Sequence, residues 1–262
     1  MIDYTQTLQK SWRLMESHPR LFIPRIASLL LSIIWFGLAL IAYNAIQQVT
    51  TEPNHTIGML GIIAIYLLVQ MCIVFYFAGM SDNMYQHVTH NEKISIDRSL
   101  RFAHDQFTHI MGLSLFVYAI IGIPFVAIIL ILLRTFFGDL NIYLSAFYIA
   151  LLGVWVVLTS WRLLFAFPIL AVDKEKQVIR ASAHFAKVHL RQTIVAWLII
   201  GAIGIVTLLI GRTINLMTGI DILLALIAGT LVVFGEMVMS VWEHIVLFEL
   251  YLETKHVKVK KK

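Results

Sequence analysis

Residues 11–24 read SWRLMESHPRLFIP, a charged, amphipathic segment whose closing proline leads into a long apolar run. Similar segments recur at 99–111, SLRFAHDQFTHIM, and at 182–195, SAHFAKVHLRQTIV, and each again stands ahead of an apolar run. We call these three segments the leaders. A leader that recurs three times before a hydrophobic stretch indicates one structural unit used three times.

The three leaders align on a serine. Ser11, Ser99 and Ser182 each begin a pattern of Ser, any residue, Arg or His, Leu or Phe, and then Met or Ala. The spacings between these serines are 88 and 83 residues, and each leader stands just before the first helix of a predicted pair. We therefore predict a single transmembrane domain, 1–262, built from three parallel repeats of an interfacial helix and a two-helix hairpin. The expected units lie near 1–86, 87–173 and 174–262.

The composition is that of a membrane protein rather than a soluble domain. Of the 262 residues, 60% are hydrophobic and only 13% are charged, and the mean hydropathy is +0.84. A soluble domain carries about 25% charged residues, which cover its water-facing surface. The apolar runs are long and strands of alternating polarity are missing, which predicts an all-α, polytopic membrane protein. The single cysteine, Cys72, excludes an intramolecular disulfide framework.

Six apolar runs are long enough to cross a membrane, because a hydrocarbon core of roughly 30 Å needs about 20 helical residues. We predict spans near 22–46, 57–80, 110–134, 142–172, 192–211 and 222–251. Pro124 and Pro168 are expected to kink the third and fourth spans, since proline lacks an N–H and its ring collides with the preceding turn.

The basic residues gather in alternate loops. All but three of the 20 Lys and Arg residues lie in the N-terminal segment up to Arg25, in the second and fourth loops, or in the tail; the exceptions are Arg134, Arg162 and Arg212. By the positive-inside rule, this pattern places both termini in the cytoplasm, for a multi-pass protein of the cell membrane (inner or plasma). Anionic headgroups account for the net charge of +5, so we expect membrane lipids rather than nucleic acid as partners.

Each leader has the apolar spacing of an amphipathic helix. In the first leader and the residues before it, the apolar side chains recur at steps of four, four and three: Tyr4, Leu8, Trp12 and Met15. Such a helix lies in the headgroup layer with its basic residues toward anionic lipid. The expected interfacial anchors are Trp12, Arg13, Arg20, Arg101 and Arg191. The alternative is that the leaders are cytoplasmic extensions of the spans.

Ionisable side chains inside the apolar runs form the candidate site. Each costs at least roughly 2.5–3.5 kcal/mol at the bilayer centre on insertion scales, so it needs a partner or a wet cavity. Three stand out, Arg162 in the fourth span and Glu236 and Glu243 in the sixth. Thr159 shares the helical face of Arg162, and Ser240 shares the face of the two glutamates.

Three polar side chains lie at a similar predicted depth. Arg162, Glu243 and Gln70 precede the acidic residue at the inner exit of their spans by 11, 10 and 12 residues, or roughly 15–18 Å along a helix. We predict that Arg162 pairs with Glu243, with Glu236 as the alternative partner, and that Gln70 adds amide hydrogen bonds. Such a pair either fixes the register of the helices or lines a path for substrate or protons.

The sequence lacks the motifs of a metal or cofactor enzyme. His87 and His90 stand near acidic residues, but the histidines form no specific zinc pattern. A P-loop, a Rossmann glycine fingerprint and a nucleophile elbow are missing as well. We therefore predict no catalytic residues, no metal and no cofactor, and a protein that is not an enzyme.

Two stretches resemble poorly characterised six-helix membrane families known as domains of unknown function. They are the first leader and residues 161–189, WRLLFAFPILAVDKEKQVIRASAHFAKVH. The shared features are a Ser-Trp-x-Leu leader and a Phe-x-x-Pro-x-x-x-x-Asp exit from the fourth span, which here runs from Phe165 through Pro168 to Asp173. The chain is also similar to the membrane domain fused to some glycerophosphodiester phosphodiesterases. The resemblance implies the six-helix fold and carries over no catalytic residues.

Two functions fit these patterns. The first is a non-enzymatic membrane protein that serves as a scaffold or binds a lipid or small solute between its units, with lipids and a protein partner or second copy as its partners. The alternative is a secondary transporter or channel that uses the polar residues of spans four and six. A hydrated central cavity that reaches Glu236 favours transport, whereas a dry, packed centre argues against it.

Overall fold

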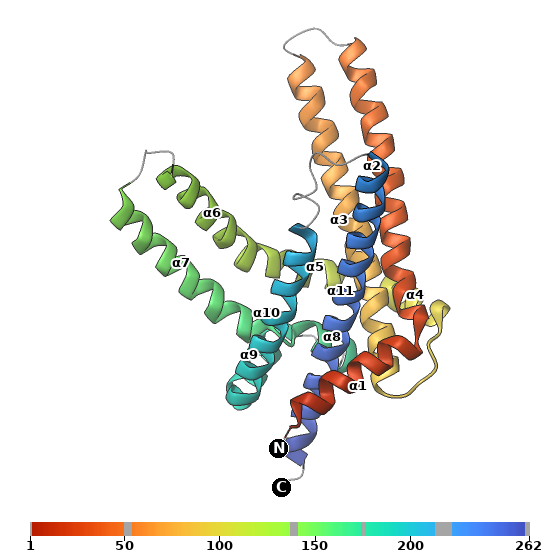
Figure 1. Cartoon of the computed structure of the whole chain (residues 1–262), viewed down its shortest axis with the longest axis vertical. Coiled ribbons are helices and arrows are strands. Elements are labelled where there is room, and N and C mark those ends of the chain that lie inside the picture. The colour runs from red at the N-terminus through yellow and green to blue at the C-terminus, as the bar shows by residue number, and fades with distance from the viewer. Residues whose placement is uncertain are drawn as a thin grey trace.

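The computed structural model describes residues 2–49, 54–136, 141–173, 175, 177–212 and 222–259, and every regular element in these ranges is a helix (Figure 1). The elements are α1 (Tyr4–Ser17), η1 (Pro19–Phe22), α2 (Ile23–Val49), α3 (Asn54–Thr89), α4 (Ile96–Asp105), α5 (Phe107–Val117), the π-helical η2 (Tyr118–Gly122), α6 (Ile123–Phe136), α7 (Ile142–Leu163), α8 (Ala166–Asp173), α9 (Val178–Val188), α10 (Leu190–Arg212) and α11 (Ile222–Val259). The predicted all-α fold is confirmed.

Six helical stretches among the described residues are long and apolar enough to cross a membrane. They are Pro19–Ala45, Gly58–Thr89, Phe107–Thr135, Tyr143–Asp173, Leu190–Thr207 and Gly229–Lys255. Each overlaps one of the six predicted spans, so the chain is a multi-pass membrane protein.

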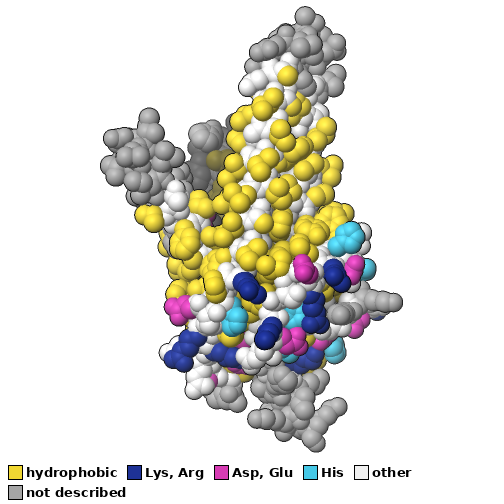
Figure 2. Space-filling model, turned by 90° about the vertical axis from the view of Figure 1, so that its right-hand side faces the viewer, with side chains coloured by type: hydrophobic (Ala, Val, Ile, Leu, Met, Phe, Trp, Pro, Cys, Tyr) yellow, Lys and Arg dark blue, Asp and Glu magenta, His cyan; other side chains and the backbone are white. Residues whose placement is uncertain are grey.

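The spans pair into three hairpins, α2–α3, α6–α7 and α10–α11. The first two hairpins diverge, and both termini lie at the end of the molecule away from the tip of α2–α3 (Figure 1). Apolar side chains cover the hairpin that rises in Figure 2, whereas charged side chains and histidines gather below it. We call this lower region, which contains α1, α4, α9 and the adjoining turns of α3, α8 and α11, the charged end.

The packed core lies at the charged end rather than along the spans. Its largest side chains are at most 1% exposed: Met84, Tyr85, Phe165, Phe248 and Tyr251. By contrast, Ile41 in α2 is 66% exposed, as expected of a side chain that faces lipid. Helices α3 and α11 run several residues past the predicted span ends at 80 and 251, because their extra turns contribute to this core.

The leaders form the helices α1, α4 and α9, and each packs against the end of another hairpin. Helix α4 packs against α3, α9 packs against α7 and α8, and α1 packs against the C-terminal helix α11. The contacts therefore run in a ring, in which every leader touches the hairpin before it and the first leader touches the last hairpin. This pattern is what three parallel repeats around one axis would produce, and the division into repeats stays a prediction.

The aligned serines lie in the buried faces of the leaders. Ser11, Ser99 and Ser182 are each 0% exposed. Their Oγ atoms donate hydrogen bonds of 2.8 to 3.0 Å, to the carbonyl oxygen of Thr7, to Asn83 Oδ1 and to the carbonyl oxygen of Arg162, respectively. A small, hydrogen-bonded side chain at this position lets the leader approach the helix beneath it closely.

Both prolines lie at irregular turns of their spans, where the sequence predicts kinks. Pro124 follows the π-helical turn η2, and the carbonyl oxygen of Ile120, which proline cannot satisfy, accepts a 3.1 Å hydrogen bond from Trp155 Nε1 of α7. Pro168 lies in the first turn of α8, after the helix breaks at Leu164 and Phe165. The break turns the chain into the charged end, where five of the eight residues of α8 are buried.

Candidate functional site

The predicted ion pair between Arg162 and Glu243 is not formed. The Arg162 side chain is exposed, and its guanidinium carbon lies 5.8 Å from the ring centroid of Trp161. None of the ion pairs among the described residues involves Arg162, Glu236 or Glu243. The reason lies in the packing, because α7 contacts α6, α9 and α10, whereas α11 contacts α10, α1 and α3.

The other predicted members of the polar cluster are also apart. Gln70 Nε2 donates a 2.8 Å hydrogen bond to Ser32 Oγ within the first hairpin. Thr159 Oγ1 donates to the carbonyl oxygen of Trp155 on its own helix, at 2.7 Å. Similar depth along three spans therefore does not bring Gln70, Arg162 and Glu243 together.

A different polar cluster lies where α2, α3 and α11 meet at the charged end. We call it the Arg25 cluster, and its members are Arg25 of α2, Asp82 and Tyr85 of α3, and Ser240, Glu243 and His244 of α11. Arg25 is within electrostatic range of Asp82 and Tyr85 on one helix and of Glu243 and His244 on the other. Asp82 is only 6% exposed and Tyr85 is 0% exposed.

Ring and backbone contacts fix the α11 side of the Arg25 cluster. The His244 ring centroid lies 5.6 Å from that of Tyr85, and its Nδ1 lies 2.6 Å from the carbonyl oxygen of Ser240. Arg25 Nε is buried without a hydrogen-bond partner. Two carboxyl groups and one guanidinium thus share a poorly solvated site between the first and the last hairpin.

Sequence reasoning missed Arg25 and Asp82 because both flank apolar runs. Arg25 counts as one of the basic residues that orient the protein, and Asp82 marks the exit of the second span. One sequence pattern could have indicated the cluster. Asp82 and Tyr85 lie three residues apart on one helical face, next to Met84, which the structure shows to be buried. The second span was predicted from its apolar residues alone, so its predicted end at residue 80 comes before Asp82 and Tyr85.

The predicted interfacial anchors lie at the charged end. Arg13, Arg20, Arg101 and Arg191 are exposed. Trp12 is 38% exposed; its Nε1 donates a 2.6 Å hydrogen bond to Glu16, and its ring meets Trp242 edge-on at 5.5 Å. The buried line of α1 is Thr7, Ser11 and Met15, so the helix turns its serine face to the protein and Trp12 lies beside that face.

A groove between α5 and α9 is the largest of the four described cavities, at 640 Å³ against 250, 460 and 600 Å³. It is lined by Thr108, His109, Gly112, Leu113 and Phe116 of α5, by Val178, Ile179, Arg180 and Ala183 of α9, and by Leu170 and Gln177. Phe116 and Ile179 are each 37% exposed, whereas Leu113 and Val178 are buried. A Cβ atom built on Gly112 would meet nothing within 4 Å, so this part of the groove is open.

The polar groups of the groove lie toward α9 and the start of α5. Arg180 Nη1 donates a 3.0 Å hydrogen bond to Gln177 Oε1, which holds the guanidinium near the groove and leaves other N–H donors free. Among the described residues that line the groove, Arg180 is the one with a formal charge. An apolar groove with one guanidinium group suits a ligand that has an apolar tail and an anionic head.

The histidines give no sign of a metal centre. Among the described residues, no group of three or more His, Cys, Asp or Glu side chains is placed to hold a metal ion. His87 Nδ1 instead lies 2.5 Å from Glu92 Oε2, and this hydrogen bond lowers the pKa of Glu92. His90 Nδ1 lies 2.8 Å from the carbonyl oxygen of Gln86.

Comparison with known proteins gives no relative. No family model, no curated protein and no solved structure matches this chain. The resemblance to six-helix domains of unknown function therefore stays an expectation, and the function has to be argued from the site itself.

Proposed function

We propose that the chain is a non-enzymatic membrane protein that binds an anionic phospholipid in the groove between α5 and α9, with the phosphate at Arg180. One observation carries this proposal: the charge of the groove. Its described lining residues include a guanidinium and no carboxylate, whereas Asp or Glu lines each of the other three described cavities. A carboxylate-free site is the one that a phosphate enters without repulsion.

The size and place of the groove support the same occupant. Its 640 Å³ falls within the roughly 300–1,000 Å³ of ligand pockets. It lies between the first helix of a span, α5, and an amphipathic leader, α9. At this level of a bilayer the headgroup of a lipid meets its acyl chains, so the chains can follow Gly112 and Phe116 while the phosphate stays near Arg180.

The distribution of basic residues supports an orientation for this activity. We infer that the charged end faces the cytoplasm of the cell membrane, with both termini on that side. The exposed arginines of the leaders then face the leaflet that is richest in anionic lipid, where each contributes about 1 kcal/mol of attraction. The groove draws its lipid from that leaflet.

A second candidate function, ion-coupled transport, is favoured by the Arg25 cluster. Ionisable groups inside a membrane protein often mark an ion or substrate path. The sequence placed this path along spans four and six. The Arg25 cluster places it instead at Arg25, Asp82 and Glu243, without span four. The two candidates separate when the groove is blocked, because lipid binding is then lost while an ion path through the Arg25 cluster is untouched.

The proposed function is tested by replacing Arg180 with glutamine. Delipidated protein in a neutral detergent is titrated with phosphatidylglycerol or phosphatidylcholine, and bound lipid is counted by native mass spectrometry. We expect the variant to bind phosphatidylglycerol about fivefold more weakly, since a partly exposed charge pair contributes up to about 1 kcal/mol. Binding of phosphatidylcholine, which has no net charge, should change less.

Arg101→Gln is the matched control, because Arg101 is an exposed arginine on the leader helix α4 and does not line the groove. It should lose clearly less affinity for phosphatidylglycerol than Arg180→Gln, because it removes surface attraction and no contact in the groove. Equal losses in the Arg180→Gln and Arg101→Gln variants would show that the lipid is held by general surface charge and would refute the assignment of the groove.

A further inference from the structure

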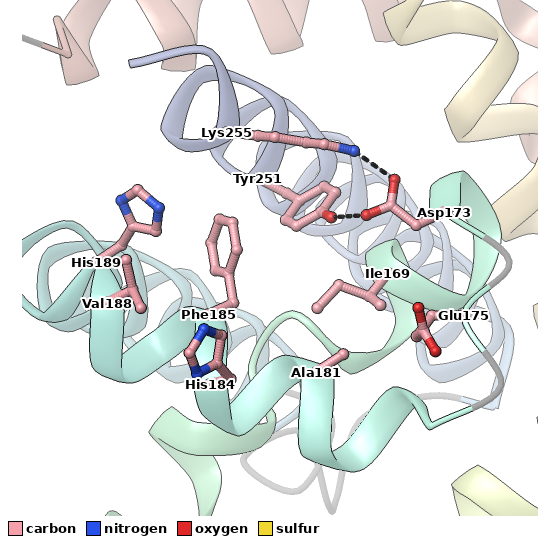
Figure 3. Close-up of a pocket in the computed structure, with 10 residues that line it drawn as sticks. All are labelled: Ile169, Asp173, Glu175, Ala181, His184, Phe185, Val188, His189, Tyr251 and Lys255. Carbon is pink, nitrogen blue, oxygen red and sulfur yellow. Dashed lines mark hydrogen bonds and ion pairs between the residues drawn. The ribbon is translucent and has the colours of Figure 1, made fainter. Parts of the chain in front are cut away.

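A second pocket lies on the other face of α9, where that helix meets α8 and α11 (Figure 3). Its volume is 250 Å³, and α9 contributes Ala181, His184, Phe185, Val188 and, just beyond its end, His189. These residues are spaced by three and four along the chain, so they form one helical face. The lipid groove uses Ile179, Arg180 and Ala183, which point the other way.

The walls of this pocket are aromatic. The Phe185 ring centroid lies 5.1 Å from that of Tyr251 and 4.7 Å from that of His189. Phe165, which is 0% exposed, lies behind both at 5.3 Å from Phe185 and 5.7 Å from Tyr251. The buried Phe165 keeps the two outer rings in place, so the aromatic wall is preformed.

One wall of the pocket carries a carboxylate that already holds an amine. Asp173 accepts a 2.5 Å hydrogen bond from the Tyr251 hydroxyl, and Lys255 Nζ lies 2.5 Å from its other oxygen (Figure 3). The same Nζ lies 5.8 Å from the Tyr251 ring centroid, within the range of a cation–π contact. The lysine side chain is 45% exposed, so it can leave this position for solvent.

The described residues that line the pocket carry more carboxylates than ammonium groups. Asp173 and Glu175 supply two carboxylates, against the one ammonium group of Lys255. An ammonium group in this pocket is therefore favoured twice, by the carboxylates and by the face of the Tyr251 ring.

We propose that this pocket binds a primary alkylammonium group, with Asp173 as its anion and Tyr251 as its aromatic wall, in the place that Lys255 occupies in the free protein. The source is either a soluble amine such as ethanolamine or the headgroup of phosphatidylethanolamine. Lys255 acts as an internal competitor, because it uses the same carboxylate. This site is independent of the lipid groove, which has no carboxylate in its described lining.

Removing the competitor tests the proposal. The Lys255→Ala variant in detergent is heated with and without ethanolamine, and ethylene glycol serves as the neutral analogue. Ethanolamine is expected to raise the melting temperature of the variant by about 2–4 °C. A weakly bound ligand that stabilises only the folded state gives a shift of this size in a chain of this length. The unmodified protein should shift less, and ethylene glycol should shift neither. Lys255→Met, which keeps the apolar stem over Tyr251, gives the same measurement if the alanine variant does not fold.

Two variants separate a specific site from general rescue by added amine. Lys10→Ala removes the lysine of another ion pair, with Glu249 at 2.7 Å, where no aromatic ring faces the described ammonium group. Ethanolamine should not stabilise it, nor the Lys255→Ala/Asp173→Asn double variant. The proposal fails if Lys10→Ala is stabilised equally, or if Lys255→Ala responds neither to ethanolamine nor to nanodiscs containing phosphatidylethanolamine. A response to the nanodiscs alone identifies the lipid headgroup as the source, and a response to ethanolamine identifies a soluble amine.

Discussion

Replacing Arg25 with methionine is expected to lower the free energy of unfolding by about 1–2 kcal/mol, because it removes the cation that faces two poorly solvated carboxyl groups. Arg25 is the cation shared by Asp82 and Glu243, on two different helices. The loss is smaller than for a buried pair in direct contact, because none of the ion pairs among the described residues joins Arg25 to either carboxyl group. Methionine keeps most of the apolar stem, so the loss reports the charge. The measurement is an unfolding titration with SDS in mixed micelles.

Arg20→Met is the matched control for this prediction, because Arg20 lies five residues earlier and its side chain is exposed. Its free energy of unfolding should change by less than about 0.5 kcal/mol, as is usual for surface substitutions. Adding Asp82→Asn to Arg25→Met removes one of the uncompensated carboxylates and should restore part of the lost stability. Equal stability of the Arg25→Met and Arg20→Met variants would contradict the role given to the Arg25 cluster.

Filling the groove with a phenylalanine at position 112 is expected to weaken phospholipid binding roughly tenfold or more. The new ring takes the place of acyl-chain atoms, and the burial of one large apolar group is worth about 1.5–3 kcal/mol. The substitution itself should be tolerated, because a Cβ atom at Gly112 would meet nothing within 4 Å. Phenylalanine also favours a helix over glycine. Bound phosphatidylglycerol is measured by native mass spectrometry on delipidated protein.

Gly153→Phe on α7 is the control for steric effects. Gly153 is also helical, and a Cβ atom there would likewise meet nothing within 4 Å. It does not line the groove. This variant should bind phosphatidylglycerol like the unmodified protein. If both phenylalanine variants lose the lipid equally, the acyl chains lie on the general surface of the spans and not in the groove.

The spans and leaders could be predicted because each depends on one stretch of sequence. An apolar run of sufficient length forms a span whatever surrounds it, and the helices α1, α4 and α9 follow from local amphipathic spacing. Pro124 and Pro168 act on their own turns, so their effects could also be predicted. The inner ends of α3 and α11 could not be predicted, because Asp82, Tyr85 and their neighbours become core residues only once the leaders cover them.

The candidate site could not be predicted because it depends on how helices face one another. Periodicity placed Arg162 and Thr159 on one face and Glu243 and Ser240 on another, but it does not say which helix each face meets. The structure sets Glu243 near Arg25 and leaves Arg162 exposed. The groove depends on Gly112 and Arg180, which are far apart in the chain, and neither residue carries a local signal of a binding site.

Photocrosslinking from the rim of the groove tests most directly whether a phospholipid occupies it. A photoreactive phenylalanine analogue replaces Phe116 at the rim or, in a separate protein, Phe147 of α7, which is 63% exposed and does not line the groove. Each delipidated protein is irradiated in neutral detergent with one equivalent of phosphatidylglycerol. We predict a lipid adduct at position 116 that Gly112→Phe suppresses, and little adduct at position 147. Equal yields at both positions would contradict the account.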